Sequence, residues 1–199
     1  MRYFLAPVLV MAMALPAAAE KLSLNELSSY LNGLRTATGA FTQINGDGTI
    51  STGTIYINRP GRIRFEYAPP DNTLVIAGAG SVAIFDPKSN VGPETYPLSR
   101  TPLSIILANR VDLAQARMVV AHGYDGTATT VTAQDPQNPE YGNIRMVFTG
   151  NPVQLRQWVI NDDAGNSTTV VLGDLRTGTS IAARLFDIQA EAGRRSTDR

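Results

Sequence analysis

The segment from Gly53 to Pro70 constrains the fold most strongly, because apolar and polar residues alternate on both sides of a tight turn. The alternating apolar side chains are Ile55, Ile57, Ile63, Phe65 and Tyr67. A period of two residues is the pattern of a β-strand with one buried face. Pro60 and Gly61 supply the turn between the two runs. The segment therefore predicts a β-hairpin with one apolar face.

The length of the turn decides which side chains face each other across this hairpin. If Pro60 and Gly61 alone form the loop, Arg59 pairs with Arg62, and apolar residues of one strand oppose charged residues of the other. If Arg62 joins the loop, the apolar residues meet on one face, and we prefer this register because it buries more apolar surface. In it, the opposed pairs are Ile55 with Tyr67, Ile57 with Phe65, and Arg59 with Ile63. Arg59 would then lie at the edge of an apolar surface, with its aliphatic stem packed and its guanidinium in need of acceptors.

Similar β-type runs recur along the chain, separated by turns of glycine, proline, asparagine and aspartate. They begin near Phe41 and continue at 73–77, 81–85, 117–121, 127–133, 144–148, 155–160 and 168–172. About ten strands are too many for one flat sheet. We predict an α+β, mainly β fold: a curved antiparallel sheet that forms an incomplete barrel, with helices capping an apolar cavity.

A stripe of leucines at spacings of three and four residues predicts an amphipathic helix from Ser23 to a point between Gly33 and Gly39. The stripe consists of Leu24, Leu27, Leu31 and Leu34. Polar residues, including Ser28 and Asn32, are placed on the opposite side of the helix. We expect the leucines to pack against the sheet.

A second helix is predicted to open at Thr101 and Pro102, a cap followed by proline. Residues 103–108 are apolar almost all round, so this helix must be covered on more than one side or lie against an apolar partner that comes and goes. The segment before it, 86–100, contains three prolines and is expected to be an irregular crossing.

The first residues have the pattern of a secretory signal. Arg2 precedes an apolar run from Tyr3 to Leu15, and Ala17-Ala18-Ala19 provides small residues for a cleavage site. The run is too short to span a bilayer, although an uncleaved N-terminal anchor is the alternative. We predict that residues 1–19 are a secretory signal peptide. The chain contains no cysteine, so its fold must hold by packing alone, which suits a bacterial periplasm.

Few residues offer catalytic or metal-binding chemistry. The single histidine, His122, is interpreted as a surface loop residue, and no serine sits in a nucleophile elbow. The loop around Asp47 lacks the acidic ligands of an EF-hand and is interpreted as a plain hairpin rather than a calcium site. Basic and acidic residues number 17 each, so the chain has no net positive charge that would attract nucleic acid. We therefore expect no enzyme activity, no cofactor, no metal and no nucleic-acid partner.

Several short motifs follow one another in an order that is specific in combination. The order is an export signal, a leucine-striped helix, Phe41-Thr42-Gln43, Gly53, Arg59-Pro60-Gly61, Arg64-Phe65-x-Tyr67-x-x-Pro70, Phe85-Asp86-Pro87 and Thr101-Pro102-Leu103. Together they resemble the LolA family, the periplasmic lipoprotein carriers of Gram-negative bacteria. The resemblance covers most of the chain after residue 19.

The resemblance implies an incomplete antiparallel barrel with a helical lid. Such carriers take acylated lipoproteins from an ATP-driven inner-membrane transporter and hand them to an outer-membrane acceptor lipoprotein. It also implies that Arg59 latches the lid and that the helix at 102–108 belongs to the lid. Ile63 stands where the family commonly has phenylalanine, and Phe65 where it often has tryptophan; both keep the surface apolar. The family's final Pro-Pro-Gly segment is missing after Ile188.

On this basis we expect one lipoprotein-carrier domain at residues 20–189, followed by a polar tail at 190–199 that is predicted to be disordered. The predicted lipid-binding cavity and lid consist of Arg59, Ile55, Ile57, Ile63, Phe65, Tyr67, Phe85, Leu103, Ile106, Leu107, Met146, Phe148 and Trp158. We expect a monomeric periplasmic protein. For Arg59 the alternative is a surface salt bridge at the hairpin end. For function it is another periplasmic lipid shuttle, or a hydrophobic-ligand or stress-sensing binding domain.

Overall fold

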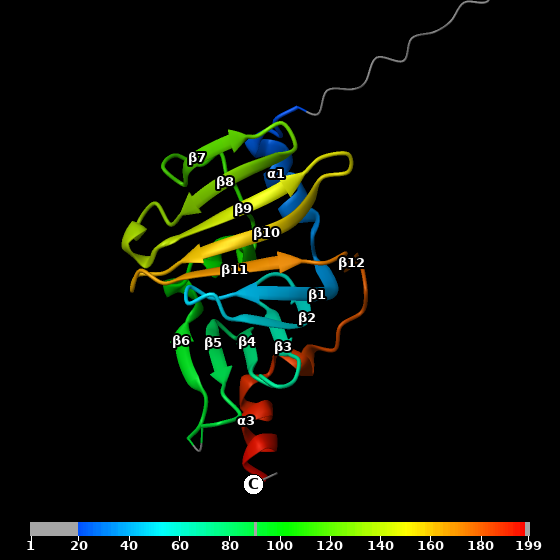
Figure 1. The fold of residues 1–199 in the computed structure, drawn as a ribbon, viewed down its shortest axis with the longest axis vertical. Coiled ribbons are helices and arrows are strands. Elements are labelled where there is room, and N and C mark those ends of the chain that lie inside the picture. Colours follow the sequence, from blue (N-terminus) through cyan, green and yellow to red (C-terminus); the bar gives the residue numbers. More distant parts are fainter. Residues whose placement is uncertain (1–19, 90, 198–199) are drawn as a thin grey trace, which may run out of the picture.

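A computed structural model of the protein describes residues 20–89 and 91–197. Its twelve strands form one antiparallel sheet in the order β6-β5-β4-β3-β2-β1-β11-β10-β9-β8-β7, and β12 also pairs with β1. The strands are β1 Thr36–Ile44, β2 Ile50–Asn58, β3 Ile63–Tyr67, β4 Leu74–Gly78, β5 Ser81–Phe85, β6 Glu94–Pro97, β7 Val119–Tyr124, β8 Ala128–Gln134, β9 Asn143–Thr149, β10 Gln154–Asn161, β11 Ser167–Leu172 and β12 Arg176–Thr177. The sheet is curved and open, with β6 and β7 at its two ends (Figure 1). The predicted fold class is confirmed.

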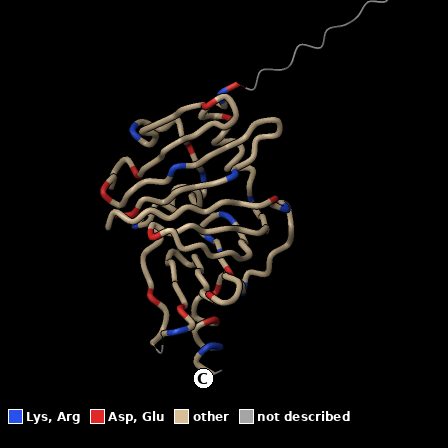
Figure 2. The backbone as a smooth tube through the Cα atoms, viewed as in Figure 1, with Lys and Arg blue, Asp and Glu red and all other residues tan. Residues whose placement is uncertain are grey.

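Three α-helices accompany the sheet: α1 Leu24–Gly33, α2 Leu103–Leu107 and α3 Ile188–Thr197. Short 3-10 turns occur at Leu98–Arg100, Pro139–Tyr141 and Ala183–Phe186. Among the described residues, no helix is long and apolar enough to cross a membrane. The predicted signal peptide, residues 1–19, lies outside the described part of the chain. Figure 2 shows acidic and basic residues interspersed along the chain, with both kinds near α3.

Helix α1 begins with a capping box. The Ser23 hydroxyl accepts a hydrogen bond from the Glu26 amide at 3.2 Å, and the Glu26 carboxylate accepts one from the Ser23 amide at 2.8 Å. These bonds satisfy backbone donors that an α-helix leaves free at its start. Leu27 and Leu31 are completely buried against the sheet, as the leucine stripe predicts.

The sheet curves around one apolar cluster. Ile63 of β3 and Met146 of β9 both belong to this cluster, although four strands of the sheet lie between them. Side chains of α1 and α2 complete it. We call the face of the sheet that surrounds this cluster the concave face.

The hairpin of β2 and β3 has a register different from both of those considered from sequence. Ile55 opposes Phe65 and Ile57 opposes Ile63, and the Asn58 amide donates to the Arg62 carbonyl at 3.0 Å. The loop is again three residues long, but it consists of residues 59–61 because Gly61 supplies the left-handed conformation, with φ of 70°. The apolar residues do gather on one face, whereas Arg59 belongs to the loop and does not pair with Ile63.

A second apolar cluster lies on the opposite, convex face of β4 and β5. It contains Leu74, Ile76, Ala83 and Phe85 from the strands, together with Phe186 and Ile188 from the C-terminal segment. Phe85 was predicted to line the cavity, and that prediction is wrong. Residues 82–85 are all apolar, so the sequence does not show which of them face the cavity.

The predicted disorder of the tail is also wrong for residues 190–197, which form most of α3. Phe186 and Ile188 anchor this segment in the convex-face cluster, and the Arg64 guanidinium donates to the Leu185 carbonyl at 2.9 Å. The Arg195 guanidinium lies 5.1 Å from the centre of the Phe85 ring. The helix is therefore held by packing and cation–π contact, neither of which its polar sequence indicates.

Part of the segment expected to be an irregular crossing is an edge strand. Residues 94–97 form β6, which pairs with β5, and all four are exposed. His122 was interpreted as a loop residue but lies in β7, where its Nε2 is 2.9 Å from the Leu22 carbonyl oxygen. It therefore links the N-terminal segment to the sheet.

Candidate functional site

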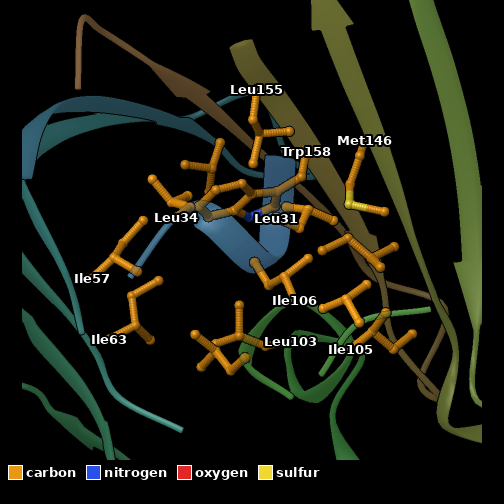
Figure 3. Packing of buried hydrophobic residues seen from close by; sticks show 14 of the residues in the cluster. Leu31, Leu34, Ile57, Ile63, Leu103, Ile105, Ile106, Met146, Leu155 and Trp158 are labelled. Carbon is orange, nitrogen blue, oxygen red and sulfur yellow. The ribbon is translucent and has the colours of Figure 1, made fainter. Parts of the chain in front are cut away.

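Nearly all of the predicted cavity residues meet in the concave-face cluster. Those buried there are Ile55, Ile57, Ile63, Phe65, Leu103, Ile106, Leu107, Met146, Phe148 and Trp158, and Tyr67 is partly buried beside them. Figure 3 shows Trp158, Leu31 and Leu34 facing Ile57 and Ile63 of the hairpin and Leu103 and Ile106 of α2. Phe41, Phe65 and Trp158 extend this surface as edge-to-face aromatic pairs, with ring centres 5.2 and 6.3 Å apart.

The cavity itself is closed in this structure. A volume of only about 10 Å³ remains between the sheet and the helices, too little for more than one water molecule. Its walls are Leu31, Leu34, Ile57, Arg59, Ile63, Ile106, Leu107, Leu155 and Trp158. The expectation of a hollow interior therefore needs correction: side chains of α1 and α2 fill the space that a ligand would occupy.

The loop that contains Arg59 ties both helices to the hairpin. The Arg59 guanidinium donates to the carbonyl of Ala108, directly after α2, at 2.7 Å, and the Gly61 amide donates to the Leu107 carbonyl at 2.9 Å. The Arg59 amide donates to the carbonyl of Arg35, just beyond α1, at 2.8 Å. Three hydrogen bonds from one loop thus connect β2 and β3 to the ends of α1 and α2.

Arg59 is a buried cation. Its side chain is 6% exposed, and burial lowers the pKa of its guanidinium from the ordinary value, with a further contribution from the positive charge of Arg35. An arginine nevertheless stays protonated in proteins. No ion pair between residues in the described ranges includes Arg59. The alternative interpretation, a surface salt bridge at the hairpin end, does not describe this geometry.

Helix α1 also holds the segment that follows α2. The side-chain amide nitrogen of Asn32 donates to the Val111 carbonyl at 2.8 Å, and the backbone amide of Val111 donates to the side-chain oxygen of Asn32 at 2.9 Å. Ser28 accepts a hydrogen bond from the Leu113 amide at 3.0 Å and donates to the Leu24 carbonyl at 2.7 Å. We call α1, α2 and the segment 108–113 the lid.

Both polar lid contacts differ from the sequence-based expectation. Ser28 and Asn32 were predicted on the side of α1 away from the leucines, whereas Ser28 is buried and both side chains bond the backbone of the segment after α2. Val111 and Leu113, which are 3% and 0% exposed, lie in a stretch without periodicity, so no pattern could have marked them.

An open groove of about 570 Å³ adjoins the lid at the start of α2. Its apolar side chains include Val82, Ile84, Leu103 and Ile160, and its rim carries Arg100, Asp162 and Asp163. Leu103 also belongs to the concave-face cluster, so the groove borders the closed interior directly. Among the described residues, no group of three or more histidine, aspartate or glutamate side chains could hold a metal ion.

Comparison with known proteins decides the family. Residues 32–189 match the family described as outer membrane lipoprotein carrier protein LolA. The chain belongs to the LolA family. Two curated relatives, each named outer-membrane lipoprotein carrier protein, are 23% identical over 186 residues in Azotobacter vinelandii and 26% identical over 188 residues in Methylococcus capsulatus. The alignments cover 89% of this chain and 89% of the first relative, and 88% of this chain and 87% of the second.

The fold of this LolA-family chain has solved counterparts. A putative outer membrane lipoprotein-sorting protein domain from Vibrio parahaemolyticus superposes with a TM-score of 0.50 at 11% sequence identity. The match covers 85% of this chain and 97% of that domain. It shows that the curved open sheet with its helices is a fold that this chain shares with that domain.

Proposed function

We propose that this protein is a periplasmic chaperone that carries acylated lipoproteins from the inner-membrane transporter to the outer-membrane acceptor. The acyl chains would lie between the concave face of the sheet and the lid. Family membership supports a carrier of lipid-modified cargo. The observation that carries the proposal is the contact of Arg59 with Ala108, which fastens a lid over an otherwise apolar interior.

The closed interior fits a carrier because the lid competes with the cargo. Burial of one methylene group contributes about 0.8 kcal/mol, so an acyl chain of roughly sixteen carbons would gain about 12 kcal/mol if it were fully buried. Such cargo would hardly leave a permanently open cavity. When the lid closes, its own leucines and isoleucines rebury themselves on the same surface, and the bonds to Arg59 and Asn32 form again. Both effects offset part of the cargo's gain and allow release.

The groove beside α2 is the proposed path for the acyl chains. It joins an apolar floor at Val82 and Ile84 to the interior through Leu103, which must move when α2 moves. Its charged rim at Arg100 and Asp162 would remain in contact with water and with the polar part of the cargo.

The proposal is tested by isolating the protein from the periplasm of its own host and identifying by mass spectrometry what copurifies with it. Acylated lipoproteins in the purified fraction are the expected result. Free phospholipid in their place would favour the alternative of a lipid shuttle. A second test measures transfer of a loaded lipoprotein to the acceptor, and a protein that never releases lipoproteins from inner-membrane vesicles would contradict the carrier role.

A further inference from the structure

Two side chains in the wall of the closed cavity carry hydrogen-bond donors without acceptors. Four buried side-chain polar atoms of the described residues lack a partner, and three of them are Nε and Nη1 of Arg59 and Nε1 of Trp158. Both residues line the same remaining void. Trp158 is completely buried and Arg59 is 6% exposed, so bulk water does not satisfy these groups. Unpaired buried donors are rare in folded proteins and call for an explanation.

The chemistry of these donors defines what could bind them. The guanidinium and the indole N–H can only donate, so the missing partner must be an acceptor. The other cavity walls are leucine and isoleucine side chains, so the same partner must carry an alkyl chain. We propose that Arg59 and Trp158 form a polar subsite for the carbonyl oxygen at the head of an acyl chain. This inference rests on the proposed function and adds the position of the acyl head group to it.

The subsite also explains how the lid bond of Arg59 can be replaced. In the closed structure one guanidinium nitrogen already donates to the Ala108 carbonyl. When a ligand displaces α2, that donor loses its acceptor, and a carbonyl oxygen of the ligand can take its place. Arginine presents its donors in a planar fork, so the cargo can receive bonds from two nitrogens at once. Arg59 would thus exchange a lid carbonyl for a ligand carbonyl.

Two sources could supply this carbonyl chemistry. One is the ester group of an acylglyceryl modification, and the other is the carboxylate of a free fatty acid. A buried guanidinium without an ion pair among the described residues binds a carboxylate more strongly than an ester, because charge-assisted hydrogen bonds are the stronger kind. Tighter binding of laurate is therefore expected from either source, and the sources are distinguished by whether the ester also binds and shifts the indole signal.

The protein contains a single tryptophan, so its indole N–H gives one signal in a nitrogen–proton correlation spectrum. The experiment titrates the chain lacking residues 1–19 with methyl laurate, with dodecyl methyl ether and with laurate. The ether matches the ester in chain length but lacks the carbonyl. We expect methyl laurate to move the indole proton signal downfield and to bind about five- to tenfold more tightly than the ether, the effect of about one hydrogen bond.

Trp158→Phe provides the matched variant, because it removes the N–H and keeps an aromatic ring. The ratio of ester to ether affinity, measured by calorimetry, should fall severalfold in this variant, and any general effect on the cavity cancels in the ratio. Equal affinities for ester and ether in the wild type, without a shift of the indole signal, would overturn the subsite and leave the carrier role standing.

Two further outcomes of the titration would also test the subsite and the carrier role. Binding of none of the three ligands would overturn both the subsite and the carrier role. Laurate that binds and shifts the indole signal, while methyl laurate does neither, would support a polar subsite but identify a fatty acid as its occupant, which contradicts the lipoprotein cargo.

Discussion

Asn32 of α1 and Val111 of the lid bond each other twice, with the side-chain amide donating at 2.8 Å and its oxygen accepting at 2.9 Å. A side-chain amide satisfies both backbone groups of one residue in this geometry. The contact joins α1 to the segment after α2 across 79 residues of sequence. The contact fastens the segment after α2 to α1 in the closed state, while Arg59 fastens the end of α2 to the hairpin.

Asn32→Ala should loosen the lid. It removes two hydrogen bonds and leaves the partly buried backbone groups of Val111 unpaired, at a cost of about 1–3 kcal/mol in the free energy of unfolding. Urea denaturation measures the loss. Asn25→Ala on the exposed side of the same helix is the control and should change the free energy of unfolding by less than about 0.5 kcal/mol. Equal effects of the two substitutions would show that the Asn32 contact adds nothing to stability.

Arg59→Leu should slow delivery of cargo while the fold stays intact. The substitution removes the bond to Ala108 and enlarges the apolar lining, so the closed state competes less well with a bound acyl chain. Loss of one charge-assisted hydrogen bond predicts roughly a tenfold slower transfer to the acceptor. Transfer of a loaded lipoprotein from purified protein to acceptor is the measurement. Arg62→Leu is the control, because among the described residues the Arg62 side chain bonds Asn58 of its own hairpin and no residue of the lid. An unchanged rate for Arg59→Leu would refute the latch.

The C-terminal helix should detach when its anchor on the convex face is disturbed. Phe186→Ala removes a buried ring, and Gly78→Ala adds a methyl group against the Phe186 backbone. Both should expose residues 188–197 to faster amide exchange while the concave-face cluster keeps its protection. Ala190→Ser, at an exposed position of the same helix, should have little effect. Unchanged exchange of α3 in both variants would show that these contacts do not hold it.

Stability should decrease in acid partly because of Asp71. Its carboxylate accepts hydrogen bonds from Ser51 and Thr73 at 2.6 Å each, which lowers its pKa below the ordinary value. A carboxyl group with a lowered pKa in the folded state stabilises the protein above its unfolded pKa, near 4, and loses that contribution as the pH falls through the folded pKa. Asp71→Asn should therefore flatten the decrease in unfolding free energy below about pH 4. Asp163→Asn is the exposed control. A slope unchanged by Asp71→Asn would contradict this assignment.

The parts of the fold that the sequence predicts are those with a strong period. The alternation in the central hairpin and the leucine stripe of α1 both indicate the buried face correctly. The preferred hairpin register was wrong, although the loop has the preferred length of three residues. The loop consists of residues 59–61 rather than 60–62, and this difference shifts the pairing by two positions. Phe85 was assigned to the wrong face because its neighbours are apolar on both sides of β5.

The lid contacts were beyond the reach of sequence patterns for a different reason. Ser28 and Asn32 bond backbone groups that lie 85 and 79 residues away, respectively, and a backbone group carries no sequence signal. Arg59 is the exception, since a charged residue beside an apolar hairpin face predicts a need for acceptors that the structure meets with a carbonyl of the lid.

The central claim is that an acyl chain enters only when α2 and the segment 108–113 leave both the sheet and α1. Three backbone amides report on this directly: Gly61 bonds the end of α2, while Val111 and Leu113 bond α1. The decisive measurement is their hydrogen exchange by nuclear magnetic resonance, with and without a saturating triacylated cysteine lipopeptide. We expect all three amides to lose protection when the lipopeptide binds, while amides within the sheet keep theirs. Unchanged or increased protection of the three amides in the saturated complex would contradict the central claim.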